Sequence, residues 1–308
     1  FEYINKYIVN INHISWKLKK IEIYSDNLVN EKLLNFENSQ DYLFSIVRNA
    51  EYYKILEKKL IRNKFFKRVS FNNFSILNKY DLVINTDLTN SITKKYFNKK
   101  IIKKYNSIAY TTILKHQSTS NISAIQVFTK KGPIAFLPIS KNETSVVYSL
   151  NNLTLNKSKN IEELIQKYNF KYKIEKIEKI EKFELKSLNL RSYYHRNVLA
   201  FGDLLHRIHP LAGQGFNMTI RDIIFLSKII KNKIDLGLPL DSSVNSEFEK
   251  NSRHRNFLFS NGIDLIHEFF NFERKLDNNF LSKSVKLLGK NYSINKMFTK
   301  IADKGIEF

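Results

Sequence analysis

The 308-residue sequence predicts a mixed α/β fold, and three stretches carry that prediction. A short apolar run at 198–201 leads through a glycine-rich loop into a helix-periodic segment that starts near Phe216. Residues 106–150 are rich in β-branched and aromatic side chains between turn signals, which indicates an antiparallel sheet. Residues 233–308 contain few glycines and place apolar residues at helical spacing. We therefore expect a sheet-rich block between α/β segments, followed by helices.

The composition limits the classes of protein that this chain can belong to. Cysteine is absent, which excludes a disulfide framework and thiolate metal sites and suits a reducing, cytoplasmic compartment. No apolar run reaches the roughly 18 residues of a membrane span, and the start shows no signal-peptide pattern.

The formal net charge of +22 has two interpretations. One is a nucleic-acid or anionic-membrane surface. The other is a Lys-, Asn- and Ile-rich composition of the kind that an AT-rich genome imposes. The lysines are scattered and no nucleic-acid motif accompanies them, so we favour the second interpretation and expect no specific nucleic acid. Weak attraction to an anionic membrane surface would follow as a by-product.

The first hundred residues predict strands around one helix. Lys20–Tyr24 alternates polar and apolar residues, as a half-buried strand does, and Trp16 is expected to anchor the core. Residues 44–62 predict a helix with Asn49 as its N-cap. Two short strands are expected to follow, at 68–77 and 81–85.

The middle of the chain predicts the antiparallel sheet itself. Its expected strands lie at 107–114, 122–129, 134–139 and 144–150, with Pro138 at an edge or end. A helix should start near Ile161. The repeat at 174–182 has a three-residue period that suits neither helix nor strand, so it predicts a solvated connector.

Helices are expected after residue 232, where Gly237 and Pro239 interrupt the chain. Their predicted ranges are 245–259, 263–270 and 281–288.

The stretch from Val198 to Asp222 is the strongest candidate for a site. Gly202 and Asp203 end the apolar run, and Gly213 and Gly215 precede the helix. Glycine lets a backbone approach a ligand closely, and a helix start directs free N–H groups and positive dipole towards it. The stretch therefore predicts a site for a ligand that is anionic or becomes so during a reaction.

The same stretch resembles the second FAD-contact motif of class A flavoprotein monooxygenases. Gly202–Asn217, followed by Arg221-Asp222, is most similar to that motif in the ubiquinone-biosynthesis hydroxylases. The stretches 81–91 and 128–138 resemble two further family motifs in the expected order, so the resemblance covers about residues 10–300.

The chain departs from the family pattern at several positions. Leu88 replaces a glycine, Lys94 an arginine, and Leu204-Leu205 an Ala-Ala pair. Ala50 stands where an arginine often contacts the cofactor, with Arg48 nearby. No Gly-x-Gly-x-x-Gly motif occurs, so we expect the sequence from Phe1 to be N-terminally incomplete and its activity to need that segment.

The resemblance implies a Rossmann-like FAD-binding domain of the para-hydroxybenzoate-hydroxylase type, here without its first βαβ unit. It would be interleaved with an antiparallel-sheet substrate domain. The substrate domain would take 1–43 and 106–190, the FAD domain 44–105 and 191–232, and a helical region 233–308.

The resemblance also assigns the cofactor site. FAD would contact Gly202, Asp203, Pro210, Gly213, Gln214, Gly215, Phe216, Asn217 and Asp87. Asp203 would accept hydrogen bonds from its ribityl or ribose hydroxyls, and the loop would pass beside the isoalloxazine ring. Spacing alone makes a turn cap the usual role for Asp87, and a packed, hydrogen-bonded role is favoured for His206. No catalytic residue is assigned and no metal is expected.

The function implied is hydroxylation of a polyprenylated phenol in ubiquinone biosynthesis. FAD would be reduced by NAD(P)H, and O₂ would be activated at flavin C4a. The inner face of a membrane and other ubiquinone-synthesis proteins would be further partners. Another FAD-dependent hydroxylase, a prenyl-lipid reductase, or a flavin-free basic module that binds lipid or nucleic acid are the alternatives.

Overall fold

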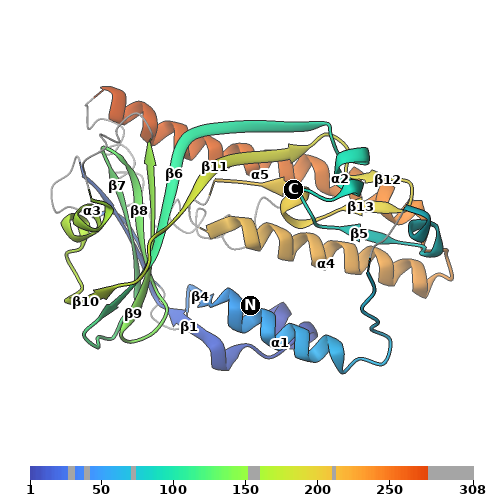
Figure 1. Cartoon of the computed structure of the whole chain (residues 1–308), viewed down its shortest axis with the longest axis horizontal. Helices are drawn as coiled ribbons and strands as arrows, with labels where there is room; N and C mark the ends of the chain where they lie inside the picture. The colour runs from blue at the N-terminus through green and yellow to red at the C-terminus, as the bar shows by residue number, and fades with distance from the viewer. Residues whose placement is uncertain (27–31, 38–41, 71–73, 152–159, 210–212, 277–308) are drawn as a thin grey trace. The chain divides into compact units, whose positions relative to one another are not determined.

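The computed structural model describes residues 1–26, 32–37, 42–70, 74–151, 160–209 and 213–276 (Figure 1). These residues form two compact units. The first contains 1–69, 106–184 and the described residues from 270 onwards; the second contains 70–105 and 185–269. The boundary between the units falls twice inside a strand, in β6 (Lys100–His116) and in β11 (Glu181–Leu190).

The first unit is built on a sheet in the order β6-β9-β8-β7-β2-β3. Its other strands are β2 (Lys20–Ser25), β3 (Lys32–Glu37), β7 (Ser123–Thr129), β8 (Gly132–Pro138) and β9 (Glu143–Asn151). All neighbours pair antiparallel except β2 and β7, which are parallel. The predicted antiparallel block is therefore confirmed, and Pro138 does end its strand.

The core of the first unit is formed by side chains that point to the buried face of these strands. Leu114 and Val146 are fully buried, whereas both neighbours of each on the same strand are partly or fully exposed, and Ile134 and Tyr148 are fully buried too. Helix α3 (Ile161–Tyr168) adds Leu164 and Ile165 to the same hydrophobic cluster. The helix expected near Ile161 is thus confirmed.

Short elements make up the rest of the described first unit. A π-helical turn, η1 (Ile4–Ile8), and a 3₁₀ turn, η2 (Asn12–Ile14), precede β1 (Ser15–Leu18), which pairs with β4 (Phe44–Val47). Helix α1 (Asn49–Ile61) has no fully buried residue. The helix predicted within 44–62 is therefore confirmed, with one correction: Asn49 is the first helical residue and the N-cap is Arg48. Residues 44–47, before the cap, form a strand.

The three-residue repeat at 174–182 is not a connector, which corrects the prediction. Ile174–Ile177 form β10, which pairs with β6, and β11 starts at Glu181. The register shifts between Ile174 and Lys176. Such an irregularity lets residues three apart lie on the same face of a strand, and both Ile174 and Ile177 pack against the core.

The second unit contains a three-stranded sheet in the order β12-β13-β5. These strands are β12 (Tyr194–His195), β13 (Val198–Ala200) and β5 (Val83–Asn85), and β13 runs parallel to β5. Around it lie the 3₁₀ turns η3 (Phe74–Lys79) and η5 (Gly202–Leu204), strand β14 (His206–Arg207), and helices α2 (Ser91–Tyr96), α4 (Gln214–Asp235) and α5 (Ser242–Leu276).

The hydrophobic core of the second unit contains Leu199, Leu204, Leu205, Leu226 and Phe248. The strand predicted at 68–77 is wrong over its described part, because η3 occupies 74–79. Phe74 and Leu77 both pack on this core, and a spacing of three suits a 3₁₀ turn.

Two predicted helices, at 245–259 and 263–270, are parts of the single helix α5, which continues through Gly262. The helix expected at 281–288 lies outside the described residues. Among the helices that the structure describes, none is long and apolar enough to span a bilayer.

Candidate functional site

The candidate site lies at one edge of the small sheet in the second unit. Strand β13 pairs with β5 in parallel, with Val198 opposite Val83 and Ala200 opposite Asn85. The Phe201 amide continues this pairing by donating to the Asn85 carbonyl at 2.9 Å. Because parallel strands end at the same edge, the turns that hold Asp87 and Asp203 are brought to one side of the sheet.

Asp203 stands in the turn that follows β13. Gly202 has a φ of 61°, a left-handed conformation that glycine adopts without strain. Asp203 is exposed, and its carboxylate makes no hydrogen bond or ion pair with any residue in the described part of the chain. No side chain caps the 3₁₀ turn η5, so the Asp203 carboxylate does not serve as its cap.

Asp87 has a different environment, although it also follows a strand. Its Oδ1 accepts hydrogen bonds from the Thr89 amide at 2.7 Å, the Thr89 hydroxyl at 2.9 Å and the Asn90 amide at 3.1 Å. These donors, those of Thr89 first, hold the pKa of Asp87 below its usual range. The observed role of Asp87 is to close the turn before α2, and its contact with a cofactor stays a prediction.

Buried Asn85, which the sequence did not single out, supports this turn. Its amide donates to the Thr93 hydroxyl at 2.8 Å, and its oxygen accepts from the Asn90 amide at 2.8 Å. Asn90 in turn caps α2 through the Thr93 amide. A polar residue at the last position of a short apolar run, Leu82-Val83-Ile84, was the available signal.

Backbone amides at the start of α4 point out of the end of the helix. Gly213 has a φ of 64° and precedes a 22-residue helix that has no side-chain cap and no acidic residue in its first turn. The first amides of an α-helix have no acceptor within the helix, and no acidic side chain in the first turn of α4 offsets their partial positive charge. A Cβ added to Gly202 or Gly213 would meet no atom within 4 Å, so both turns border open space.

The other predicted cofactor residues differ in how exposed their side chains are. Phe216 and Asn217 are exposed on the first turn of α4, whereas Gln214 is 9% exposed and accepts from the Asn217 amide at 3.4 Å. Gly215 lies close to Ile208. Pro210 lies outside the described residues.

A buried polar pair links β14 to α4. His206 Nε2 lies 2.5 Å from Asp222 Oδ2, and the two side chains are 0% and 3% exposed. The Asn256 amide donates to Asp222 Oδ1 at 3.1 Å. Burial, followed by the Asp222 charge, raises the pKa of neighbouring Tyr193.

The favoured role of His206 as a packed, hydrogen-bonded residue is confirmed by this pair. Sequence reasoning missed Asn256, which reaches Asp222 from α5 and follows no local motif. His209 is 1% exposed and meets the Tyr105 ring edge-on at 4.9 Å.

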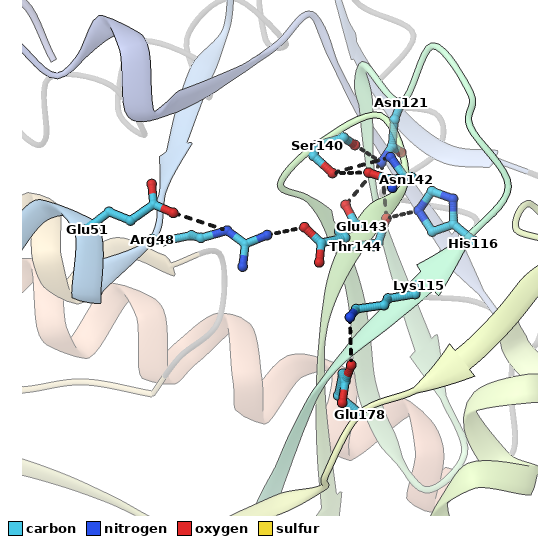
Figure 2. Close-up of polar contacts among 10 residues, drawn as sticks. All are labelled: Arg48, Glu51, Lys115, His116, Asn121, Ser140, Asn142, Glu143, Thr144 and Glu178. Carbon is cyan, nitrogen blue, oxygen red and sulfur yellow. Dashed lines mark hydrogen bonds and ion pairs between the residues drawn. The ribbon is translucent and has the colours of Figure 1, made fainter.

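Arg48 belongs to a separate polar cluster in the first unit (Figure 2). Its guanidinium pairs with Glu143 at the start of β9 and lies 3.9 Å from Glu51 on α1. Arg48 therefore ties α1 to the sheet of its own unit.

The donor set suits a flavin. A free carboxylate accepts from hydroxyl groups, while the amides of an uncapped helix start favour a ring system that gains negative charge on reduction. No group of three potential metal ligands occurs among the described residues.

The comparison with known families agrees with this site. A family described as "FAD binding domain" matches residues 107–235. The ubiquinone biosynthesis monooxygenase COQ6 of Drosophila melanogaster is 23% identical over 301 residues, covering 81% of this chain and 63% of the relative. The 3-demethoxyubiquinol 3-hydroxylase of Escherichia coli is 29% identical over 155 residues, covering 48% of this chain and 40% of the relative. The chain thus spans less than two thirds of the length of either relative.

Solved structures show the same fold. The p-nitrophenol 4-monooxygenase PnpA of Pseudomonas putida has a TM-score of 0.74 at 11% identity, covering 98% of this chain and 86% of that one. Klebsiella pneumoniae HpxO, solved with FAD and uric acid, has a TM-score of 0.70 at 12% identity, covering 97% and 85%. The predicted mixed α/β fold of the para-hydroxybenzoate-hydroxylase type is thereby confirmed. The chain is thus similar in fold to FAD-dependent monooxygenases, and the relatives that it resembles in sequence include enzymes named for ubiquinone biosynthesis.

Proposed function

We propose that the second unit holds the flavin-ring side of FAD and that the protein hydroxylates a polyprenylated phenol in ubiquinone biosynthesis. The observation that carries the proposal is one strand–turn–helix unit that combines a free carboxylate at Asp203 with an uncapped helix start at Gln214. The names of the relatives in sequence support the reaction and the substrate class.

Each element of the site has a definite task in this proposal. Asp203 accepts hydrogen bonds from the ribityl or ribose hydroxyls, which orients the cofactor. The first amides of α4 would lie beside the ring and would stabilise negative charge on it by about 0.3–2 kcal/mol. The flavin itself, when bound and reduced by NAD(P)H, supplies the reaction with O₂.

The other parts of the chain have proposed tasks too. The sheet over 106–150 forms the floor of the substrate pocket, and residues 1–43 belong with it. Residues 44–105 and 191–232 belong to the cofactor domain, and 233–308 form the helical region. Asp87, Pro210, Gly215, Phe216 and Asn217 complete the cofactor contacts. The protein acts at the inner face of a membrane, beside other ubiquinone-synthesis proteins.

Titration of the protein with FAD tests the site. We expect Asp203→Ala to raise the dissociation constant about tenfold to a hundredfold, because a hydrogen bond to a charged group contributes about 1.5–3 kcal/mol. Flavin fluorescence and absorbance measure the binding, and thermal unfolding checks that the fold persists.

Asp235→Ala is the matched control, because Asp235 is an exposed carboxylate near the other end of the same helix. The control should bind FAD as the wild type does. A folded wild-type protein that binds no FAD contradicts the proposal, and so does an Asp203→Ala variant with unchanged affinity.

A further inference from the structure

A groove of about 660 Å³ lies in the second unit, apart from the turns of the candidate site. One wall is a stripe of α5, with Ser246, Lys250, Arg253 and Phe257 at spacings of three and four residues. The rest of the lining includes Arg191 directly after β11, Tyr194 in β12 and Ile101 in β6.

Several basic side chains of this groove are available to a ligand. Arg191, Lys250 and His254 form no side-chain hydrogen bond or ion pair with any residue that the structure describes. Arg253 is held in place, since its Nη1 lies 3.0 Å from Glu249 Oε1 and donates to the Arg191 carbonyl at 3.4 Å. Among the described residues that line the groove, Glu249 is the only carboxylate, so this part of the lining carries a net positive charge.

Apolar side chains stand exposed among these cations. Phe257 is 46% exposed and Ile101 is 44% exposed, and both line the groove. Single exposed apolar residues are common on protein surfaces. Here two of them share one groove with unpaired cations, and this combination indicates an amphiphilic partner.

The start of β6 also combines exposed apolar side chains with lysines, next to the groove. Ile101 and Ile102 are flanked by Lys99, Lys100, Lys103 and Lys104. Ile102 is 54% exposed. Lys103 pairs with Asp264 and Glu268, whereas the other three lysines make no ion pair with the described residues.

We infer that this groove and the adjoining Lys99–Lys104 segment dock the protein on a bilayer that contains anionic phospholipid. Arg191, Lys250 and the free lysines would meet the headgroup phosphates, while Ile101, Ile102 and Phe257 enter the interfacial layer. Clustered lysines and arginines attract anionic leaflets by about 1 kcal/mol each, and exposed apolar side chains add burial in the interface. The docking does not require bound flavin, so its test is separate from that of the proposed function.

Co-sedimentation with vesicles tests the inference. The wild-type protein should bind phosphatidylcholine vesicles that contain about 30% phosphatidylglycerol and should not bind pure phosphatidylcholine vesicles. Lys250→Glu should weaken binding to the anionic vesicles about tenfold, since it replaces an attraction with a repulsion at the contact. Lys228→Glu is the matched control, because Lys228 is an exposed lysine on α4 and the substitution changes the net charge equally.

A second pair of variants tests the apolar contribution. Phe257→Ser should weaken binding several-fold even where salt screens the charges. Ile234→Ser, at an exposed position of α4, should leave binding unchanged. Circular dichroism checks that all four variants fold.

Three outcomes would overturn the inference. The wild type could fail to bind anionic vesicles, or Lys228→Glu could weaken binding as much as Lys250→Glu, which would assign the attraction to the net charge of the whole chain. Alternatively, the protein could ignore vesicles yet bind a short RNA in a Lys250-dependent manner, which would assign the groove to nucleic acid.

Discussion

Asp87 and Asp203 show how neighbouring residues decide the role of a side chain. Both follow parallel strands, but the next residues differ. Thr89 and Asn90, two and three positions after Asp87, donate hydrogen bonds to its carboxylate. Asp203 is followed by Leu204 and Leu205, which are fully buried and offer no side-chain donor. The leucines fix the turn in the core and leave the carboxylate outside, where a ligand can reach it.

His206 and Asp222 carry a prediction at the same scale. Asp222→Ala should lower the free energy of unfolding by about 1–3 kcal/mol, since it leaves a buried imidazole nitrogen without its hydrogen-bond partner. The double variant with His206→Ala should lose less than the sum of the two single losses, which urea denaturation would measure as a coupling energy.

Exposed His13 supplies the control for this pair. His13→Ala should leave stability within about 0.5 kcal/mol of the wild type. Strictly additive losses for His206→Ala and Asp222→Ala would show that the two side chains do not act as a pair.

At the scale of the element, β10 is the clearest example of tertiary contacts overriding local pattern. Its three-residue period contradicts a regular strand, yet Ile174 and Ile177 both pack on the core because the register shifts between them. The pairing partner β6 lies about sixty residues earlier in the chain, as the register Ile177 with Leu114 shows. No window of local sequence contains that partner.

Substitutions in the repeat distinguish a strand from a connector. Ile177→Ala should reduce the free energy of unfolding by about 1–2 kcal/mol, because it removes half-buried apolar area from the core. Ile180→Ala should have a smaller effect, since Ile180 follows β10 and lies outside the core cluster. Equal losses in chemical denaturation would mean that the β10 contacts do not stabilise the protein.

At the scale of the whole molecule, alkaline stability depends on buried phenols such as Tyr172. Its hydroxyl donates to Asn121 Oδ1 at 2.9 Å, and the Asn121 amide donates to the Ser140 carbonyl at 2.7 Å, within the cluster that Figure 2 shows in part. Burial raises the pKa of Tyr172 to about 12, above the value of 10.0 for a free phenol.

A raised folded-state pKa means that the neutral phenol stabilises the fold. This contribution is complete below pH 10 and is lost as the pH rises from 10 through 12, by about 2–3 kcal/mol in total. Tyr172→Phe should therefore flatten the fall in stability over that range, as measured by denaturant unfolding at each pH. Tyr80→Phe, at an exposed position, should keep the wild-type slope.

The sequence was most informative where local pattern and tertiary structure agree. The run Val198–Ala200, the helix after Gly213 and the strands of the 106–150 block could all be predicted, because their periodicity matches their burial. The Asn256 contact to Asp222 and the ion pair between Arg48 and Glu143 could not, because each joins residues from distant elements. The turn role of Asp87 was accessible from Thr89 and Asn90 alone.

The parallel pairing of β5 with β13 has a consequence for biosynthesis. The two strands lie more than a hundred residues apart, as the register of Val83 with Val198 shows, and the sheet strands β7, β8 and β9 are translated between them. A ribosome therefore releases a complete set of hairpins for the first unit while β5 still lacks its neighbour. The edge that carries Asp87 and Asp203 is assembled late, and a chain interrupted before residue 200 would expose an unpaired strand to proteases and aggregation.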